Sequence, residues 1–298
     1  MTNPAPIYVI DRKTGKQFEE TVLGEKWIRW AYQNSESHFL ERVLFRSKLI
    51  SKLMGAWYDS SFSKSKIAPT IAELAIDESE FAEPTDSYVS FNDFFIRHLK
   101  EEARPFSDKK EDIVSPADGR TLVFPKLDEN TYIPVKGFPF SIKTMLPDIY
   151  DRFTNGALAI IRLCPADYHR YHFPCTGTIT QSIDIQGALH SVNPIALGSG
   201  PDVFSENKRT YTLIDTQNAG TMCFIEVGAF GVGTIVNTRT NGAVKKMDEK
   251  GFFKFGGSTV VVLFEQDRIQ FSEDLVENSA AGKETLLKLG EPLATVIS

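Results

Sequence analysis

Residues 255–264 read FGGSTVVVLF, in which two glycines, a serine and a threonine lead into five consecutive apolar residues. A short run of β-branched and aromatic side chains after a turn signal is typical of a strand buried in a sheet. Taken alone, the Gly-Gly-Ser segment predicts a hairpin turn that feeds this strand. The two glycines also leave the peptide bond between Gly257 and Ser258 open to attack by a side chain.

Short runs of the same kind, broken by glycine and proline, continue from about residue 112 to the end of the chain. They predict a mainly antiparallel β half, residues 107–298, with one barrel-like or sandwich-like core. No internal repeat indicates a solenoid or a propeller. The clearest predicted strands are Ala157–Leu163, Thr178–Ile185, Thr210–Asp215, Thr221–Val227, Gly233–Val236, Ser258–Phe264 and Ile269–Phe271.

Residues 1–106 are expected to be helical, because apolar residues recur at helical spacing from Glu25 to about Leu99. The chain is therefore predicted to be an α+β protein. In His38–Trp57 the apolar residues share one face and basic residues lie elsewhere, so this helix can lie on an anionic membrane or pack on its own domain. Ser90 and Asp93 predict the capped start of a helix from Phe91 to about Ala103, and Thr70–Phe81 is a weaker helical candidate.

Composition and charge exclude several classes of protein. With 42% hydrophobic residues the chain should fold, and a net charge of −6 argues against nucleic-acid binding. Residues 1–66 carry 11 basic and 7 acidic side chains, whereas the remainder carries 22 and 32. Three cysteines without a C-x-x-C pair indicate a reducing compartment. Neither a signal peptide nor a run of about 18 apolar residues is visible, so any membrane contact is expected to be peripheral.

Two polar clusters besides the Gly-Gly-Ser segment could carry chemistry. In SPADG at 115–119 a turn presents the single carboxylate of Asp118, which taken alone is more often a turn-capping residue than a catalytic one. DYHRYH at 167–172 places His169 and His172 near a carboxylate, an arrangement that suits proton transfer, a divalent metal or simply a hydrogen-bonded polar loop. His190 is a third candidate.

Together and in this order, the three clusters resemble the phosphatidylserine decarboxylase proenzyme family. The resemblance spans about Glu25 to Thr295. Many members of the family carry Leu-Gly-Ser-Thr where this chain has Gly-Gly-Ser-Thr, which resembles another branch. Further family-like segments are SFNDFFIR at 90–97, Arg104-Pro105, residues 168–174, Ser191-Val192-Asn193, Val227-Gly228-Ala229 and Val232-Gly233.

The resemblance implies a self-processing enzyme. Ser258 attacks the carbonyl of Gly257, the chain is cleaved there, and Ser258 becomes a covalent pyruvoyl group that replaces any pyridoxal phosphate or metal. By the same resemblance His172 removes the serine proton and Asp118 orients and stabilises that imidazole. The β chain, 1–257, and the α chain, 258–298, are expected to remain together as a heterodimer, and a homodimer is left open.

The resemblance also implies the reaction. The pyruvoyl ketone forms a Schiff base with the amine of phosphatidylserine, CO2 leaves, His169 protonates the carbon, and phosphatidylethanolamine is released. Asp167 either tunes a histidine or caps its turn. A lipid substrate favours the membrane interpretation of His38–Trp57, with the rings of Trp27, Trp30 and Trp57 at the headgroup level. The expected location is the cytoplasmic face of a bacterial cell membrane.

Three other functions remain as alternatives. A metallohydrolase on a β scaffold would use His169, His172, His190 and either Asp118 or Asp167 as ligands. A membrane-binding protein without catalysis would keep only the scaffold. A decarboxylase of a related serine phospholipid would share the reacting headgroup.

Overall fold

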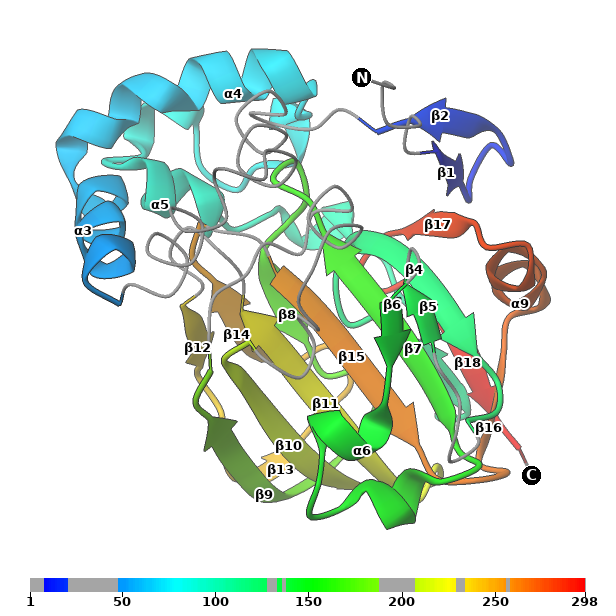
Figure 1. Ribbon diagram of the computed structural model, residues 1–298. Coiled ribbons are helices and arrows are strands. Elements are labelled where there is room, and N and C mark those ends of the chain that lie inside the picture. The colour runs from blue at the N-terminus through cyan, green and yellow to red at the C-terminus, as the bar shows by residue number, and fades with distance from the viewer. Residues whose placement is uncertain are drawn as a thin grey trace, which may run out of the picture.

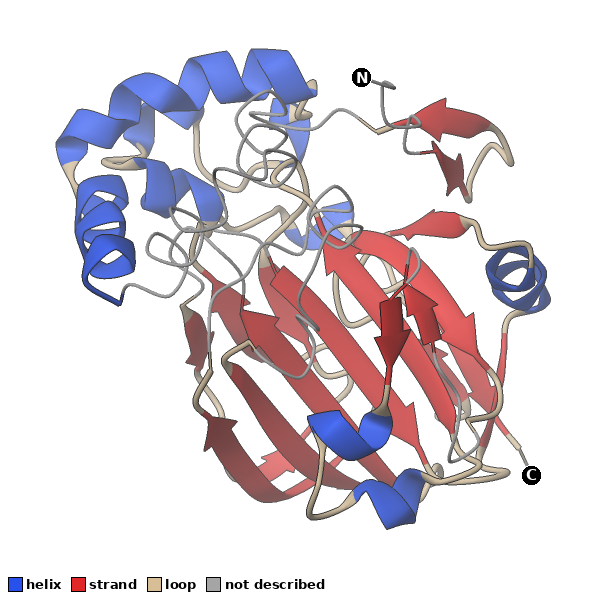
Figure 2. Ribbon diagram, in the orientation of Figure 1, coloured by secondary structure: helices blue, strands red, loops and turns tan. Residues whose placement is uncertain are grey.

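The computed structural model describes residues 8–20, 48–127, 133–135, 138–187, 207–228, 234–255 and 258–297, with the backbone alone at 48–52, 133–135, 138–140 and 258. It confirms the α+β class (Figures 1 and 2). Helices from residues 48–95 gather at the upper left in Figure 1, above one end of a large, mainly antiparallel sheet.

The large sheet has ten strands in the order β13-β9-β10-β11-β15-β7-β4-β17-β1-β2. Every pairing in it is antiparallel except that of β1 with β17. The central strands β7 and β11 are buried along their whole length, which explains why most of their residues are apolar. The strands are β1 Tyr8–Asp11, β2 Gln17–Glu19, β4 Gly119–Phe124, β7 Ala157–Leu163, β9 Gly177–Ile185, β10 Arg209–Thr216, β11 Thr221–Gly228, β13 Gly242–Val244, β15 Ser258–Phe264 and β17 Glu284–Leu287.

Smaller sheets complete the core. Their strands are β12 Ile235–Asn237, β14 Glu249–Phe253 and β8 Arg170–His172; β16 Ile269–Phe271, β18 Pro292–Val296 and β3 Asp112–Val114; and β5 Ile133–Val135 with β6 Phe138–Phe140. The two three-stranded sheets share one apolar cluster with the large sheet, which includes Tyr171, Phe253, Val260 and Phe271. A second cluster joins the other face to α6 Ile142–Met145 and η6 Tyr150–Phe153.

The core is therefore sandwich-like. The expectation of a barrel is wrong for the strands that the structure describes, because the order of the large sheet ends at β13 and β2 without closure.

The helices near the N-terminal side form a small core of their own. Ile67, Phe81, Tyr88, Phe91 and Phe94 pack together there. The elements are α3 Lys48–Asp59, η2 Ser61–Lys66, α4 Ile67–Leu74, η3 Glu78–Glu80, η4 Thr85–Ser87, α5 Phe91–Phe95 and η5 Glu101–Ala103, while α9 Glu273–Ala280 lies near the C-terminus.

Two predicted helices are shorter than expected. Ser90 does cap α5, since its Oγ accepts from the backbone N–H of Asp93 at 3.2 Å. However, α5 ends at Phe95, because the chain beyond it bonds to residues 80–82: Ala82 donates to His98, and Lys100 donates to Glu80. The helix expected over Thr70–Phe81 is α4, which ends where Ala75 adopts a left-handed conformation.

Most strand predictions are confirmed. Ala157–Leu163, Ser258–Phe264 and Ile269–Phe271 match their predicted bounds, and the others shift by one or two residues where they are described. The β1–β2 hairpin was not expected. Of the helix predicted over His38–Trp57, the described part is α3, and Trp27 and Trp30 lie outside the described residues. The proposed boundary at residue 106 stays a prediction.

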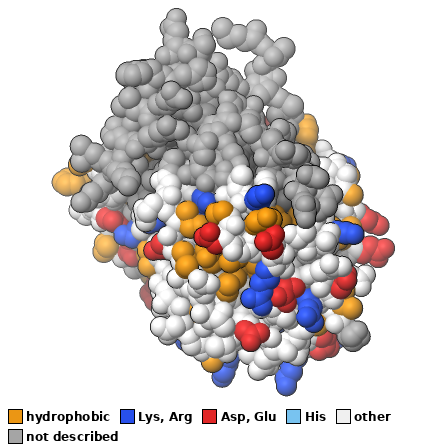
Figure 3. Space-filling view, turned by 60° about the horizontal axis from the view of Figure 1, so that its bottom comes forward, with side chains coloured by type: hydrophobic (Ala, Val, Ile, Leu, Met, Phe, Trp, Pro, Cys, Tyr) orange, Lys and Arg blue, Asp and Glu red, His pale blue; other side chains and the backbone are white. Residues whose placement is uncertain are grey.

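Exposed apolar side chains are concentrated in particular regions of the molecular surface. On the face that Figure 3 brings forward, apolar side chains gather in one area, with charged side chains of both signs within and beside it. Among the described residues of the helical part at 48–95, the exposed large apolar side chains are Leu53, Trp57, Phe62 and Val89. None of the helices within the described ranges is long and apolar enough to cross a membrane.

Candidate active site

The segment that leads into β15 is fixed at both ends. Ser258 pairs in register with Gly228 of β11 and with Leu163 of β7. On the other side, the backbone N–H of Phe255 donates to Asn92 Oδ1 of α5 at 2.9 Å. The Phe255 ring lies 4.4 to 5.2 Å from the rings of Tyr58, Phe91 and Phe95. Gly256, Gly257 and the side chain of Ser258 lie outside the described residues.

His169 is fully buried and presents one bare ring nitrogen. Its Nδ1 lies 2.9 Å from the carbonyl oxygen of Asp167. Since a carbonyl oxygen only accepts, Nδ1 carries the proton of the neutral ring and Nε2 holds a lone pair. Nε2 has no hydrogen-bond partner within the described part of the chain. Burial lowers the pKa of His169 to about 3, so the ring is neutral near pH 7.

Two contacts place His169 beside the segment that leads into β15. Its ring packs on Phe95 with 3.8 Å between centroids, and Phe95 also contacts Phe255. Its carbonyl accepts from the backbone N–H of Phe253 at 2.9 Å. His169 thus contacts Phe253 directly and Phe255 through Phe95, just before the Gly-Gly-Ser segment.

His172 ends β8 and is held mainly through its backbone. Its N–H donates to the carbonyl of Pro116 at 2.8 Å, two residues before Asp118. The ring stacks near Tyr168, and its buried Nδ1 has no partner among the described residues. Burial and then Arg170 lower the pKa of His172 to about 4, although Asp118 opposes them. His172 is therefore a second neutral imidazole with an unpaired ring nitrogen.

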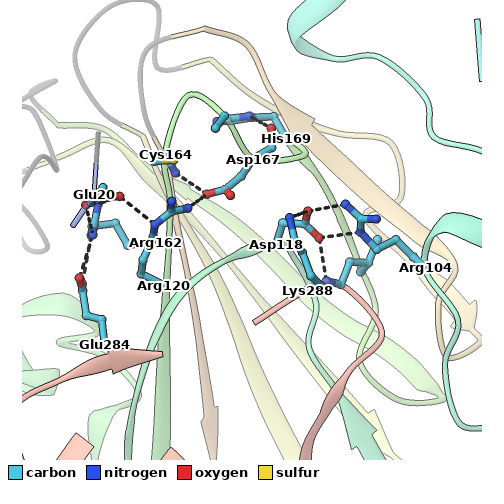
Figure 4. Close-up of polar contacts among 12 residues, drawn as sticks. Glu20, Arg104, Asp118, Arg120, Arg162, Cys164, Asp167, His169, Glu284 and Lys288 are labelled. Atoms are coloured by element: carbon cyan, nitrogen blue, oxygen red, sulfur yellow. Dashed lines mark hydrogen bonds and ion pairs between the residues drawn. The ribbon is translucent and has the colours of Figure 1, made fainter. Parts of the chain in front are cut away.

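Asp118 is fully buried and lies among cations (Figure 4). Arg104 donates to both carboxylate oxygens, at 2.9 and 2.7 Å, and Lys288 Nζ lies at 3.2 Å. The backbone N–H of Leu289 donates at 2.8 Å. Burial alone would raise the pKa of Asp118, but the charges of Lys288 and Arg104 outweigh burial. The pKa of the carboxyl group therefore lies far below its usual range, and the group stays ionised.

The expected direct contact between Asp118 and His172 is not formed. Within the described ranges, the hydrogen bonds of Asp118 go to Arg104, Lys288 and Leu289. Two cations and an amide are stronger partners for a carboxylate than a neutral imidazole. Asp118 instead acts on His172 through its negative charge, which raises the pKa of the imidazole.

Asp167 combines the two roles considered for it. Its carboxylate accepts from the backbone N–H of Cys164 at 2.7 Å and caps that turn. Its carbonyl oxygen is the acceptor for His169 Nδ1. The carboxylate also pairs with the buried Arg120, which begins a row of alternating charges (Figure 4).

Sequence reasoning missed several of these residues. Arg104 was noticed only as part of a family-like segment, and Lys288 carries no local signal. The row of charges that starts at Asp167 continues through Arg120, Glu20, Arg162 and Glu284, and its members come from distant parts of the chain. No short motif could have found them.

The metal hypothesis lacks a ligand set in the part of the chain that is described. No three His, Cys, Asp or Glu side chains gather there in a way that could hold a metal ion. His190, the third proposed ligand, lies outside the described residues.

Comparisons with known proteins agree on one family. A family model described as phosphatidylserine decarboxylase matches residues 91–295. Similar proteins named phosphatidylserine decarboxylase proenzyme occur in Clostridium species. The protein of Clostridium perfringens is 40% identical over 96% of this chain and 99% of its own length. The protein of Clostridium kluyveri is 41% identical over 96% of this chain and 98% of its own length. The protein of Clostridium beijerinckii is 39% identical over 98% of this chain and 99% of its own length.

Proposed function

The chain belongs to the phosphatidylserine decarboxylase family, and we propose that it cleaves itself between Gly257 and Ser258 and then converts phosphatidylserine to phosphatidylethanolamine and CO2. One observation carries the proposal. Two neutral imidazoles, the buried His169 and the partly buried His172, each have a buried ring nitrogen without a partner among the described residues, and they lie in and beside β8, which pairs with β14 just before the Gly-Gly-Ser segment. Unpaired buried polar atoms are rare in folded proteins and usually have a catalytic or ligand-binding reason.

Self-cleavage needs a nucleophile, a base that takes up its proton, and an anion that stabilises the protonated base. Ser258 Oγ attacks the carbonyl carbon of Gly257 while its proton passes to His172. His172 returns that proton to the nitrogen of residue 258 as the C–N bond breaks, which leaves an ester and a free amine. Loss of the α-proton of residue 258 then expels the Gly257 carboxylate, and hydrolysis releases ammonia and leaves the pyruvoyl group. Asp118 stabilises the transient imidazolium by its charge, which Arg104 and Lys288 keep in place.

Residue 258 suits a covalent cofactor because its backbone is anchored between two neighbouring strands. The pyruvoyl group supplies a ketone that binds the serine amine and accepts the electrons released with CO2. The carbon that lost CO2 needs one proton, which His169 Nε2 takes up from water and then donates to that carbon. Because burial favours the neutral ring, a protonated His169 gives up its proton readily. Its hydrogen bond to Asp167 keeps the lone pair on Nε2.

An exposed apolar face of the helical part is the proposed membrane contact. Leu53 and Trp57 are one helical turn apart on α3, with 63% and 41% of their surfaces exposed, and Phe62 of η2 is 81% exposed. The Tyr58 ring contacts the Trp57 ring, with 4.9 Å between centroids, and also packs 4.4 Å from the Phe255 ring. A lipid surface at this face would therefore lie close to the cleavage segment.

The two product chains share the sheet. The α chain, 258–298, contributes the central strand β15 together with β17, β16, β18 and α9. Its strands pair on several sides with strands of the β chain, 1–257, so the cleaved enzyme remains a heterodimer. We place it on the cytoplasmic face of a bacterial membrane, in keeping with three free cysteines and bacterial relatives.

The test is an activity measurement on vesicles that contain phosphatidylserine. Parent protein and the Ser258→Ala variant are incubated with the vesicles, and phosphatidylethanolamine is quantified by mass spectrometry. The parent should form the product without added pyridoxal phosphate or metal, and Ser258→Ala should form none. Equal amounts of product from both proteins would refute a catalytic role for residue 258. A parent protein that is cleaved but forms no product would refute phosphatidylserine as the substrate.

A further inference from the structure

Two buried arginines face each other in the large sheet. Arg120 of β4 and Arg162 of β7 are direct cross-strand partners, and each is at most 6% exposed. Like charges directly opposite each other destabilise a strand pair, and burial deprives them of water. These two residues therefore need an anion between them.

Glu20 supplies that anion. Its Oε1 lies 2.8 Å from Arg120 Nε, and its Oε2 lies 2.8 Å from Arg162 Nη2. The residue is 7% exposed. Each arginine has a second carboxylate on its far side, Asp167 for Arg120 and Glu284 for Arg162. Figure 4 shows the resulting row of five charges, which we call the charge ladder: Glu284, Arg162, Glu20, Arg120 and Asp167.

One end of the charge ladder reaches the active site. The carbonyl oxygen of Asp167 accepts from His169 Nδ1 at 2.9 Å and from Arg97 Nη2 at 3.4 Å. A displacement of Asp167 would move the acceptor that keeps the proton of His169 on Nδ1. The position of Asp167 is in turn set by Cys164 and Arg120.

Glu20 comes from an element that none of the catalytic motifs includes. It follows the β1–β2 hairpin, which β1 attaches to β17 in parallel register. Arg12 strengthens this attachment, since its Nε lies 2.7 Å from Asp274 Oδ2. Both β17 and Asp274 lie in the segment that becomes the α chain.

We propose that Glu20 is a positioning residue for the decarboxylation step. It neutralises the opposed arginines and, through Arg120 and Asp167, holds His169 with Nε2 free to act. This inference rests on the proposed function and adds a residue of the N-terminal hairpin to its machinery.

The experiment compares Glu20→Gln with Glu19→Gln, a neighbouring substitution at an exposed carboxylate. For each cleaved protein, kcat per pyruvoyl group and KM for phosphatidylserine are measured in mixed micelles, along with the unfolding temperature. We expect Glu20→Gln to lose about 10- to 100-fold in kcat, the effect of a small misplacement of a catalytic group, with KM within about twofold of the parent. Glu19→Gln should match the parent.

A merely structural role would lower the unfolding temperature and leave kcat per pyruvoyl group unchanged, and that result would overturn the inference. A rise in KM with kcat unchanged would overturn it too. If the parent and Glu19→Gln were themselves inactive, the proposed function would fail instead.

A second variant covers the case in which Glu20→Gln does not fold. The triple variant Glu20→Gln, Arg162→Met, Glu284→Gln removes the outer part of the charge ladder and leaves Arg120 paired with Asp167. Because Arg120 no longer faces another arginine, this variant should be cleaved, and its kcat should stay within about threefold of that of the parent. This change is much smaller than the loss expected from a misplaced catalytic group. A cleaved triple variant that lost kcat tenfold or more would contradict the account of Glu20 as the shared counter-ion.

Discussion

The substitution Asp118→Asn separates the charge of Asp118 from its shape. Asparagine can still accept from the backbone N–H of Leu289, but it offers no anion to Arg104 and Lys288. Breaking a buried ion pair from one side costs about 3–5 kcal/mol. Here the lower end applies, because Arg104 keeps its contact with Glu80 at 2.9 Å and the Lys288 side chain is 40% exposed. We expect a loss of about 3 kcal/mol in the free energy of unfolding.

The same substitution should slow self-cleavage. Asp118 raises the pKa of His172, so its charge favours the imidazolium that forms when the serine proton is taken. An effect of one pKa unit corresponds to about 1.4 kcal/mol and about tenfold in rate. The assay follows the conversion of freshly synthesised precursor to two chains on a denaturing gel. Asp215→Asn, at an exposed carboxylate of β10, is the matched control.

Cleavage of Asp118→Asn at the parental rate, with its stability lowered as expected, would refute the electrostatic role of Asp118. The residue would then serve only to hold Arg104 and Lys288 in the fold.

Three further predictions follow from the same contacts. Ser258→Ala and His172→Ala should remain uncleaved, whereas His169→Ala should be cleaved yet lose at least about 100-fold in kcat, as is typical when a proton-transfer group is removed; parental turnover in His169→Ala would exclude its role. Replacing Leu53, Trp57 and Phe62 together by serine should weaken binding to anionic vesicles by about tenfold or more in a sedimentation assay, because three exposed apolar side chains would no longer enter the interface, while Ile183→Ser on β9 should leave binding unchanged; unchanged binding of the triple variant would move the membrane contact elsewhere. Stability in urea should fall as the pH drops from about 6.5 toward 4, because the lowered pKa values of His169 and His172 mean that the unfolded chain takes up protons which the folded chain does not, and it should fall further below about 4 as Asp118 and Asp167, whose pKa values are also lowered, become protonated on unfolding; a urea midpoint that stayed constant from pH 7 to pH 4 would contradict the burial of neutral imidazoles.

The local features of the fold could be predicted from the sequence because their causes are local. β-Branched runs between turn signals located β7 and β15, and a serine in the N-cap position located the start of α5. The end of α5 could not be predicted, since it depends on pairing with residues 80–82. Whether the sheet closes into a barrel likewise depends on which distant strands meet.

The candidate site divides in the same way. Histidines three residues apart and a serine after two glycines form short patterns, so His169, His172 and Ser258 could be proposed directly. The partners of Asp118 come from positions 14, 170 and 171 residues away in sequence. Glu20 reaches Arg162 across 142 residues. Such contacts exist only once the sheet has assembled, and a lone charged residue in a sequence is usually solvated.

The central claim is that this chain makes its own cofactor from Ser258, and the most direct test is the intact mass of the purified parent protein under denaturing conditions. The account predicts two chains that correspond to residues 1–257 and 258–298, with the smaller one lighter by one ammonia than simple hydrolysis would leave it. A single mass for the full chain, or a smaller chain that retained its serine amine, would contradict it.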